Sequence, residues 1–155
     1  MGFFADVTER KFLEDGIERI NLCLLGLGND FKDNIGKITE LCGELLGGTC
    51  ALYNRLNEGM LCAIGQWQTP PDFNPRTNPE GHICYDLIKG AGTDGLLFIP
   101  DLSATRYAET DVNVRLYGLK SYLGHVVYCN RENVGSLCVV FQRPFQPTEN
   151  DKRLL

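Results

Sequence analysis

The chain has 155 residues, of which 43% are hydrophobic and 23% charged, and its formal net charge is −5 at pH 7. This length suits one domain with a proper core, and no apolar run is long enough to suggest a membrane span. Lysine and arginine are scattered rather than clustered, which argues against a nucleic-acid surface because phosphate binding needs a basic patch. The sequence therefore predicts one soluble domain with neither nucleic acid nor membrane as a direct partner.

The cysteines give no sign of a metal site or a disulfide framework. They form neither a CxxC pair nor a Cys/His spacing typical of zinc, and their number is odd. The seven are Cys23, Cys42, Cys50, Cys62, Cys84, Cys129 and Cys138. Most lie among apolar residues, so we interpret them as small buried hydrophobes in a reducing cytoplasm. The N-terminus lacks the pattern of a signal peptide, which agrees with a cytoplasmic location.

The first third of the chain predicts two helices. Apolar residues recur near helical spacing from Glu9 to about Leu25, with Thr8 or Asp6 available as N-cap. Glycines at 26 and 28 interrupt the pattern, and a second helix is expected from Asp30 to Leu46.

The remainder of the chain predicts a largely antiparallel sheet. Cys50 to Leu56 and Met60 to Trp67 form a hairpin, and the proline-rich residues 68–81 form a surface loop or lid. Further along the chain we expect a short helix at 82–89, a strand at 96–99 and a second short helix at 111–117. Strands at 121–129 and 134–142 follow, and an exit helix at 149–155 ends the chain. The class is α+β, with five clear strands and room for a sixth in the loop.

One stretch carries a family resemblance. Residues 97–127, LFIPDLSATRYAETDVNVRLYGLKSYLGHVV, predict a buried strand, a pocket-forming connection and a second buried strand. A strand ending in IPDL, a loop with tyrosine and YGLKSYLG running into a strand resemble the second half of a GAF domain, a small-molecule-sensing module of signalling proteins. The resemblance extends over residues 29–155. It implies a central sheet of about six antiparallel strands, with terminal helices on one face and a ligand pocket on the other.

The segment before this domain resembles a different module. Residues 2–12, GFFADVTERKF, are similar to the last strand and exit of a PAS domain. We therefore expect a PAS exit and connecting helix at 1–28 and a GAF domain at 29–155. The resemblance implies a piece of a multidomain two-component protein such as a sensor histidine kinase, with a PAS domain before it and an output domain after it. The alternative is an ordinary capped helix start.

Candidate ligand-binding residues follow from the loop-bearing face that the resemblance assigns to the pocket. They are Trp67, His82, Cys84, Tyr85, Asp101, Tyr107 and Tyr122. Each has a structural interpretation as well. His82 and Cys84 suit a helix cap and a core cysteine, Asp101 a turn, and Trp67 either a pocket wall or a seal over the core.

Four specialised functions of GAF domains were compared with these residues. Bilin attachment is not expected, because the Cys-His pair is missing around Glu109 and Thr110. Cyclic-nucleotide binding is disfavoured, because Gln142-Arg143 replaces the usual Asn-Lys pair. Free methionine sulfoxide reductases use a cysteine in a Gly-hydrophobic-Cys turn, which residues 81–84 loosely resemble, although no second cysteine lies between residues 85 and 120. Haem would need an axial ligand such as His82.

The sequence thus predicts a non-catalytic sensory or regulatory domain. It would bind an unidentified small molecule and pass the signal through its terminal helices, paired in a homodimer. The alternatives are a ligand-free dimerisation module and a reductase that uses Cys84. The sequence names neither the ligand nor a cofactor.

Overall fold

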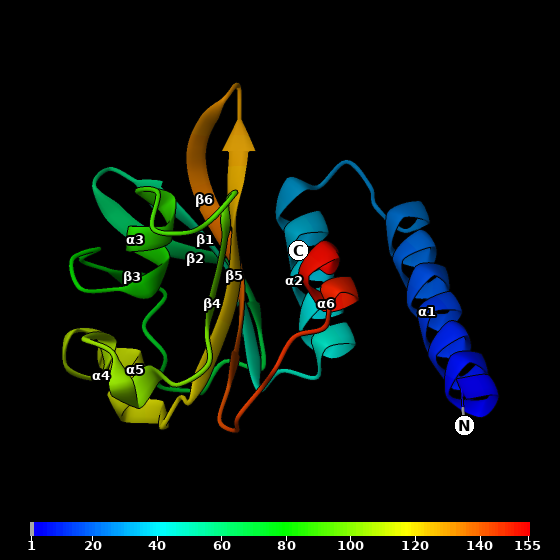
Figure 1. Cartoon of the computed structure of the whole chain (residues 1–155). Coiled ribbons are helices and arrows are strands. Elements are labelled where there is room, and N and C mark those ends of the chain that lie inside the picture. Colours follow the sequence, from blue (N-terminus) through cyan, green and yellow to red (C-terminus); the bar gives the residue numbers. More distant parts are fainter. Residues whose placement is uncertain (1) are drawn as a thin grey trace.

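A six-stranded antiparallel sheet forms the centre of the molecule (Figure 1). The computed structural model describes the backbone of residues 2–155 and the side chains of residues 8 and 10–155. The strand order is β3-β2-β1-β6-β5-β4. The strands are β1 (Cys50–Asn57), β2 (Met60–Trp67), β3 (Arg76–Thr77), β4 (Leu96–Ile99), β5 (Ser121–Cys129) and β6 (Glu132–Phe141). The expected α+β class is confirmed, and the sixth strand lies in the proline-rich loop.

Two tight hairpins fix the register of the sheet. The turn between β1 and β2 places Glu58 and Gly59 at φ 51° and 75°, and the turn between β5 and β6 places Asn130 and Arg131 at φ 51° and 66°. Two consecutive residues with positive φ match the twist of antiparallel strands. The two hairpins then join through β1 and β6, whose register pairs Cys50 with Val140.

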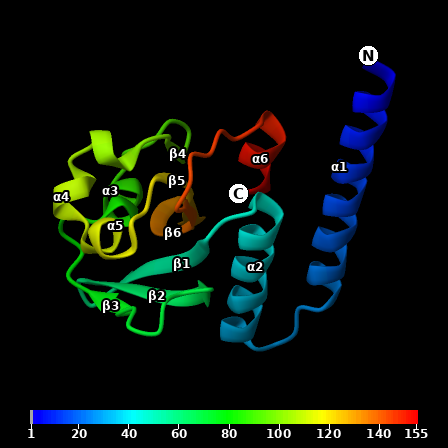
Figure 2. The same cartoon turned by 90° about the horizontal axis from the view of Figure 1, so that it is seen from below.

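Helices cover one face of the sheet (Figures 1 and 2). They are α2 (Phe31–Leu46) and α6 (Glu149–Leu154), with α1 (Gly2–Leu25) standing outside α2. The Asp30 side chain caps α2 by accepting a hydrogen bond from the Asp33 N–H, and Gly47 ends the helix in the left-handed region. This layer buries one of the two hydrophobic clusters of the core, which includes Leu123, Val139 and Phe141.

Short helices and the proline-rich loop cover the opposite face. They are α3 (Ile83–Ile88), the 3-10 helix η1 (Leu102–Ala104), α4 (Tyr107–Thr110) and α5 (Val112–Tyr117). The second hydrophobic cluster lies beneath them and includes Leu87, Leu102 and Tyr122. The sheet is therefore buried on both faces, by long helices on one side and by short connections on the other.

The N-terminal helix starts earlier than the sequence pattern predicts. It runs from Gly2 instead of Glu9, so the segment that resembles a PAS strand is helical. The side chains of residues 2–7 and 9, on which part of this resemblance rests, lie outside the described residues, and the PAS assignment stays a prediction. Among the helices that the structure describes, none has both the length and the apolar character needed to cross a membrane.

A β-bulge in β2 decides which side chains face which layer. Tyr53 pairs with Gly65 but the next residue, Asn54, pairs with Ala63, so Ile64 is extra. A strand without a bulge would place Ala63, Gly65 and Trp67 on one face. The bulge leaves Ala63 on the side of the short connections and turns Gly65 and Trp67 toward α2.

We predict that Gly43→Ala destabilises the fold through Trp67. A Cβ atom at Gly43 would lie 2.1 Å from Cε3 of the indole. The clash should lower the free energy of unfolding by about 1–3 kcal/mol. Gly36→Ala on the same helix is the matched control, because nothing lies within 4 Å of its Cβ position, and it should gain up to about 1 kcal/mol from helix propensity. Urea unfolding followed by the fluorescence of the only tryptophan measures both; equal effects would contradict this packing.

Candidate functional site

A cavity of about 90 Å³ lies between the sheet and the short connections. A single water molecule needs about 10–15 Å³ by the same kind of measure, so the space admits a molecule of several non-hydrogen atoms. Much of the wall is apolar and comes from the strands, α5 and the proline-rich loop. The apolar side chains of the wall include Leu52, Leu61, Phe73, Val114, Leu119 and Val140.

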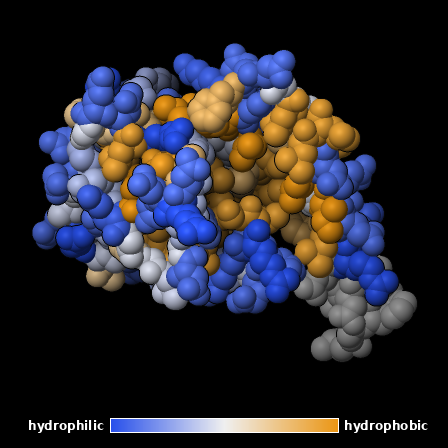
Figure 3. Space-filling model, turned by 90° about the horizontal axis from the view of Figure 1, so that it is seen from above, coloured by the Kyte–Doolittle hydropathy of each residue, from blue (hydrophilic) through white to orange (hydrophobic). Residues whose placement is uncertain are grey.

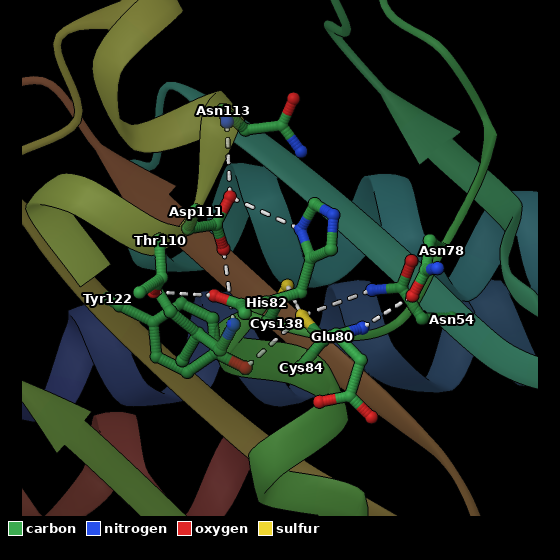
Figure 4. Close-up of polar contacts among 12 residues, drawn as sticks. Asn54, Asn78, Glu80, His82, Cys84, Thr110, Asp111, Asn113, Tyr122 and Cys138 are labelled. Carbon is green, nitrogen blue, oxygen red and sulfur yellow. Dashed lines mark hydrogen bonds and ion pairs between the residues drawn. The ribbon is translucent and has the colours of Figure 1, made fainter. Parts of the chain in front are cut away.

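Four buried polar side chains of the cavity wall lie together, and we call this group the polar end of the cavity (Figure 4 shows the side chains). Asn54 comes from β1, Cys84 from α3, Tyr122 from β5 and Cys138 from β6. All four are at least nine-tenths buried. They meet because each strand presents alternate residues to this face, while α3 packs its first turn across the same strands.

The sulfur of Cys84 is the centre of this polar group. The Asn54 side-chain amide donates to it at 3.3 Å, and the Tyr122 hydroxyl and the Cys138 sulfur lie 3.4 Å and 3.6 Å away. The hydrogen bond with the Cys138 thiol is the main cause that lowers the pKa of Cys84, with the Tyr122 hydroxyl adding to it, while burial acts in the opposite direction. The pKa of Cys138 is raised, chiefly by its hydrogen bond with Cys84. Because the Asn54 amide also donates to the Cys84 sulfur, Cys84 is the better placed of the two to carry a thiolate.

The Asp111 carboxylate links the N-terminus of α3 to the N-terminus of α5. One carboxylate oxygen lies 3.2 Å from Nδ1 of His82 and accepts the N–H of Asn113, and the other accepts the N–H of Ile83 at 3.1 Å. The hydrogen bond with Asp111 raises the pKa of His82, against the effect of burial. The arrangement places a buried, ionisable pair at the wall of the cavity.

Gly81 allows these two segments to approach closely. Its φ is 87°, and a Cβ atom there would lie 2.7 Å from the Thr110 carbonyl oxygen. The Thr110 hydroxyl donates to the Gly81 carbonyl at 2.9 Å. A side chain at position 81 would therefore separate His82 from Asp111.

The structure brings three of the seven candidate residues to the cavity, namely His82, Cys84 and Tyr122. The other four lie elsewhere, and each has a separate role or position. Trp67 packs on Gly43 of α2, Asp101 caps η1 by accepting the Ser103 N–H, the Tyr107 hydroxyl donates to Asp86, and Tyr85 carries Lys89 over its ring.

Three residues of the site were not found from the sequence. Asn54 and Cys138 lie in apolar strands, where alternation gives their face but not their partners. Asp111 was read only as the start of a short helix. A polar residue on the buried face of a strand, as Asn54 is, was the one available signal.

No set of three or more histidine, cysteine, aspartate or glutamate side chains is placed to hold a metal ion in the part of the chain that the structure describes.

Comparison with known proteins gives similarity of fold alone. No protein-family profile matches the sequence, and no curated protein matches it. A free methionine-R-sulfoxide reductase from Neisseria meningitidis, solved in complex with its substrate, superposes with a TM-score of 0.70 at 12% identity, over 92% of this chain and 80% of that one. The GAF domain of an Acinetobacter phosphoenolpyruvate-protein phosphotransferase gives a TM-score of 0.69 at 13% identity, over 95% and 85% of the two chains. That of the Coxiella burnetii phosphotransferase gives 0.70 at 8% identity, over 92% and 84%.

The chain therefore has the GAF fold, as its sequence predicts. The expectation that the domain catalyses nothing is contradicted, because free methionine-R-sulfoxide reductases are enzymes and share this fold. That expectation was wrong because it took the fold of a sensory module as evidence about chemistry, which depends on the side chains of the site.

We predict that the His82–Asp111 pair makes stability depend on pH. The folded-state pKa of His82 exceeds the ordinary value of 6.5. The stabilisation is therefore complete below the unfolded pKa and is lost as the pH rises through the folded pKa. Asp111→Asn should lower the free energy of unfolding more at about pH 6 than at about pH 9, as measured by urea unfolding. In a His82→Gln background the effect of Asp111→Asn should no longer change with pH; if it still does, another group is responsible.

Proposed function

We propose that this chain is a sensory or regulatory GAF domain whose cavity binds a small molecule. The observation that supports this proposal is the apolar cavity with one polar end, on the face of the sheet opposite the terminal helices. Small-molecule sites are typically concave, largely apolar and supplied with a few directed polar groups. The Neisseria reductase, which has the same fold, was solved with its substrate bound.

The lining indicates the class of ligand. Its described residues include no lysine or arginine, and its one carboxylate is already paired with His82. An anionic ligand would lack a counter-charge unless His82 supplied it, so we propose a small, uncharged and mainly apolar molecule. A hydrogen-bonding group on that molecule would face Asn54 and Tyr122.

The same strands connect the cavity to the helices. On β6, Cys138 and Val140 lie on the cavity side while Val139 and Phe141 pack beneath the helical layer. A ligand that favours one arrangement of α3, α5 and the proline-rich loop would bias the position of these strands, through its differential affinity for the two states. We propose that α1 and α6 connect this change to neighbouring PAS and output domains.

We predict that Ala63→Leu blocks binding. Ala63 lies in the cavity wall, and the larger side chain would occupy the space of the ligand. Affinity for an uncharged ligand identified by a thermal-shift screen should fall about tenfold or more, which is about 1.4 kcal/mol. Ala104→Leu adds the same volume at an exposed position outside the cavity and serves as the control. A hit that binds wild type, Ala63→Leu and Ala104→Leu equally would place the ligand elsewhere, and a screen without hits would count against the proposal.

One observation favours a second candidate, the reduction of a free sulfoxide. Cys84 lies in the cavity wall with hydrogen bonds that lower its pKa, and thiolates are the nucleophiles of this chemistry. The test is formation of methionine from free methionine sulfoxide with dithiothreitol as reductant. Cys84→Ser should abolish the activity, and Cys129→Ser, at an exposed position outside the cavity, should retain it. No methionine above a protein-free control would exclude this candidate.

We also propose a homodimer through the N-terminal helix. Large apolar side chains of α1 are exposed, including Phe12, Ile17, Leu22, Leu24 and Leu25. Beside α1, apolar residues line a hollow shared with α2 and α6 (Figure 3). Exposed apolar surface on this scale marks an interface more often than free surface. A dimer that binds no small molecule would favour the alternative of a dimerisation module.

We predict that Ile17→Glu weakens this dimer. The isoleucine is 58% exposed in one chain and lines the hollow. A buried carboxylate in its place would occur on both subunits, so the dissociation constant should rise about tenfold or more. Light scattering with size-exclusion chromatography over a concentration series measures it. Ile17→Leu keeps the apolar surface and should stay dimeric. A wild-type chain that is monomeric throughout would refute the interface.

A further inference from the structure

Two cysteines from distant parts of the chain meet in the cavity wall. Cys84 on α3 and Cys138 on β6 are separated by 54 residues, yet their sulfurs lie 3.6 Å apart (Figure 4). Both are free thiols and both line the cavity. Contact between the sulfurs leaves no side chain between them, so a bond can form along the line that joins them.

The surroundings make the two sulfurs unequal. Asn54 donates to the Cys84 sulfur, and the Tyr122 hydroxyl and the Cys138 thiol are placed to do so. Negative charge is therefore stabilised on Cys84, which makes it the nucleophile, while Cys138 keeps its proton.

Cys50 provides an internal comparison. It lines the same cavity and is buried to the same extent as Cys84, with 8% of each residue exposed. Burial raises the pKa of Cys50 to about 11. A reagent that enters the cavity can thus reach both cysteines, but only one of them is activated.

We propose that Cys84 and Cys138 are a peroxide-responsive thiol pair that closes reversibly to a disulfide in the cavity wall. The Cys84 thiolate attacks one oxygen of a hydroperoxide, the O–O bond breaks, and the other oxygen leaves as an alcohol or water after taking up a proton. Cys84 is then a sulfenic acid. The Cys138 sulfur attacks the Cys84 sulfur, its proton is released, and the sulfenic oxygen leaves as water. Two electrons pass from the thiols to the peroxide, and an external dithiol returns them.

Disulfide formation changes the polar end of the cavity. A disulfide is about 2.0 Å long, so the sulfurs must approach by roughly 1.6 Å. In the disulfide Cys84 can no longer be a thiolate, so it no longer accepts the hydrogen bonds that Asn54 and Tyr122 would donate to a thiolate. If the cavity binds a small molecule, as proposed above, oxidation alters its polar contacts; the thiol chemistry itself does not depend on that proposal.

The test uses the whole chain, first reduced and then treated with stoichiometric hydrogen peroxide. Remaining thiols are alkylated, the protein is digested without reductant, and linked peptides are identified by mass spectrometry. We expect a Cys84–Cys138 link that dithiothreitol reverses. Cys50 should be recovered as alkylated thiol, and its rate of oxidation should be lower than that of Cys84 by a factor of about ten or more. A Cys84–Cys50 link would overturn the proposal, as would recovery of both Cys84 and Cys138 as thiols.

Variants assign the two roles. Cys138→Ser should stop at a sulfenic acid on Cys84, trapped by dimedone, and Cys84→Ser should leave Cys138 unoxidised. Cys129→Ser, at an exposed position outside the cavity, is the control and should form the disulfide at the wild-type rate. The assignment would be overturned if the Cys84→Ser variant formed a sulfenic acid on Cys138 while the Cys138→Ser variant formed none on Cys84. The wild-type peptide map decides the proposal even if a variant does not fold.

Discussion

The burial of β6 on both faces is the constraint on which the rest of the structure depends. From residue 135 to residue 141 every position of this strand is buried, and successive side chains alternate between the two clusters of the core. Val139 and Phe141 support the helical layer, whereas Cys138 and Val140 form part of the cavity wall. Because the two faces of the strand move together, packing alone would transmit a change at the cavity to the helical layer.

A polar group inside such a core costs free energy unless it is hydrogen-bonded. Here Asp111, Asn54 and Cys84 find hydrogen-bond partners on elements that are far apart in the sequence. Asp111 accepts hydrogen bonds from Ile83 and Asn113, and Asn54 donates to Cys84. The short connections are thereby held to the sheet at the cavity itself, so the contacts that stabilise this layer are the same contacts that a ligand or an oxidant would disturb.

Much of the fold could be predicted because its signals are local. Strands β2, β4 and β5 begin and end where alternation and turn residues place them, and Asp30 caps α2 at the expected position. The bulge at Ile64 has no such signal. It places Trp67 in the helical layer, which agrees with a seal over the core and not with a pocket wall, the two interpretations that the sequence left open. The site was only partly predictable. Asp111 lies 28 residues from Ile83, and Cys138 lies 54 residues from Cys84. Across such separations the sequence pattern indicates which face a side chain occupies but not which residue it contacts.

Domains of phosphotransferases and free methionine-R-sulfoxide reductases share this fold, so the fold does not decide the chemistry of this chain. The decision depends on what surrounds Cys84. A cysteine whose pKa is raised by burial carries little thiolate and reacts slowly, and burial raises the pKa of Cys50 in the same cavity. Donors from β1 and β5 and a second thiol from β6 give Cys84 the opposite electrostatics. The strand residues that line the cavity thus also set the electrostatics of Cys84, so the proposed small-molecule binding and the proposed thiol chemistry share one position.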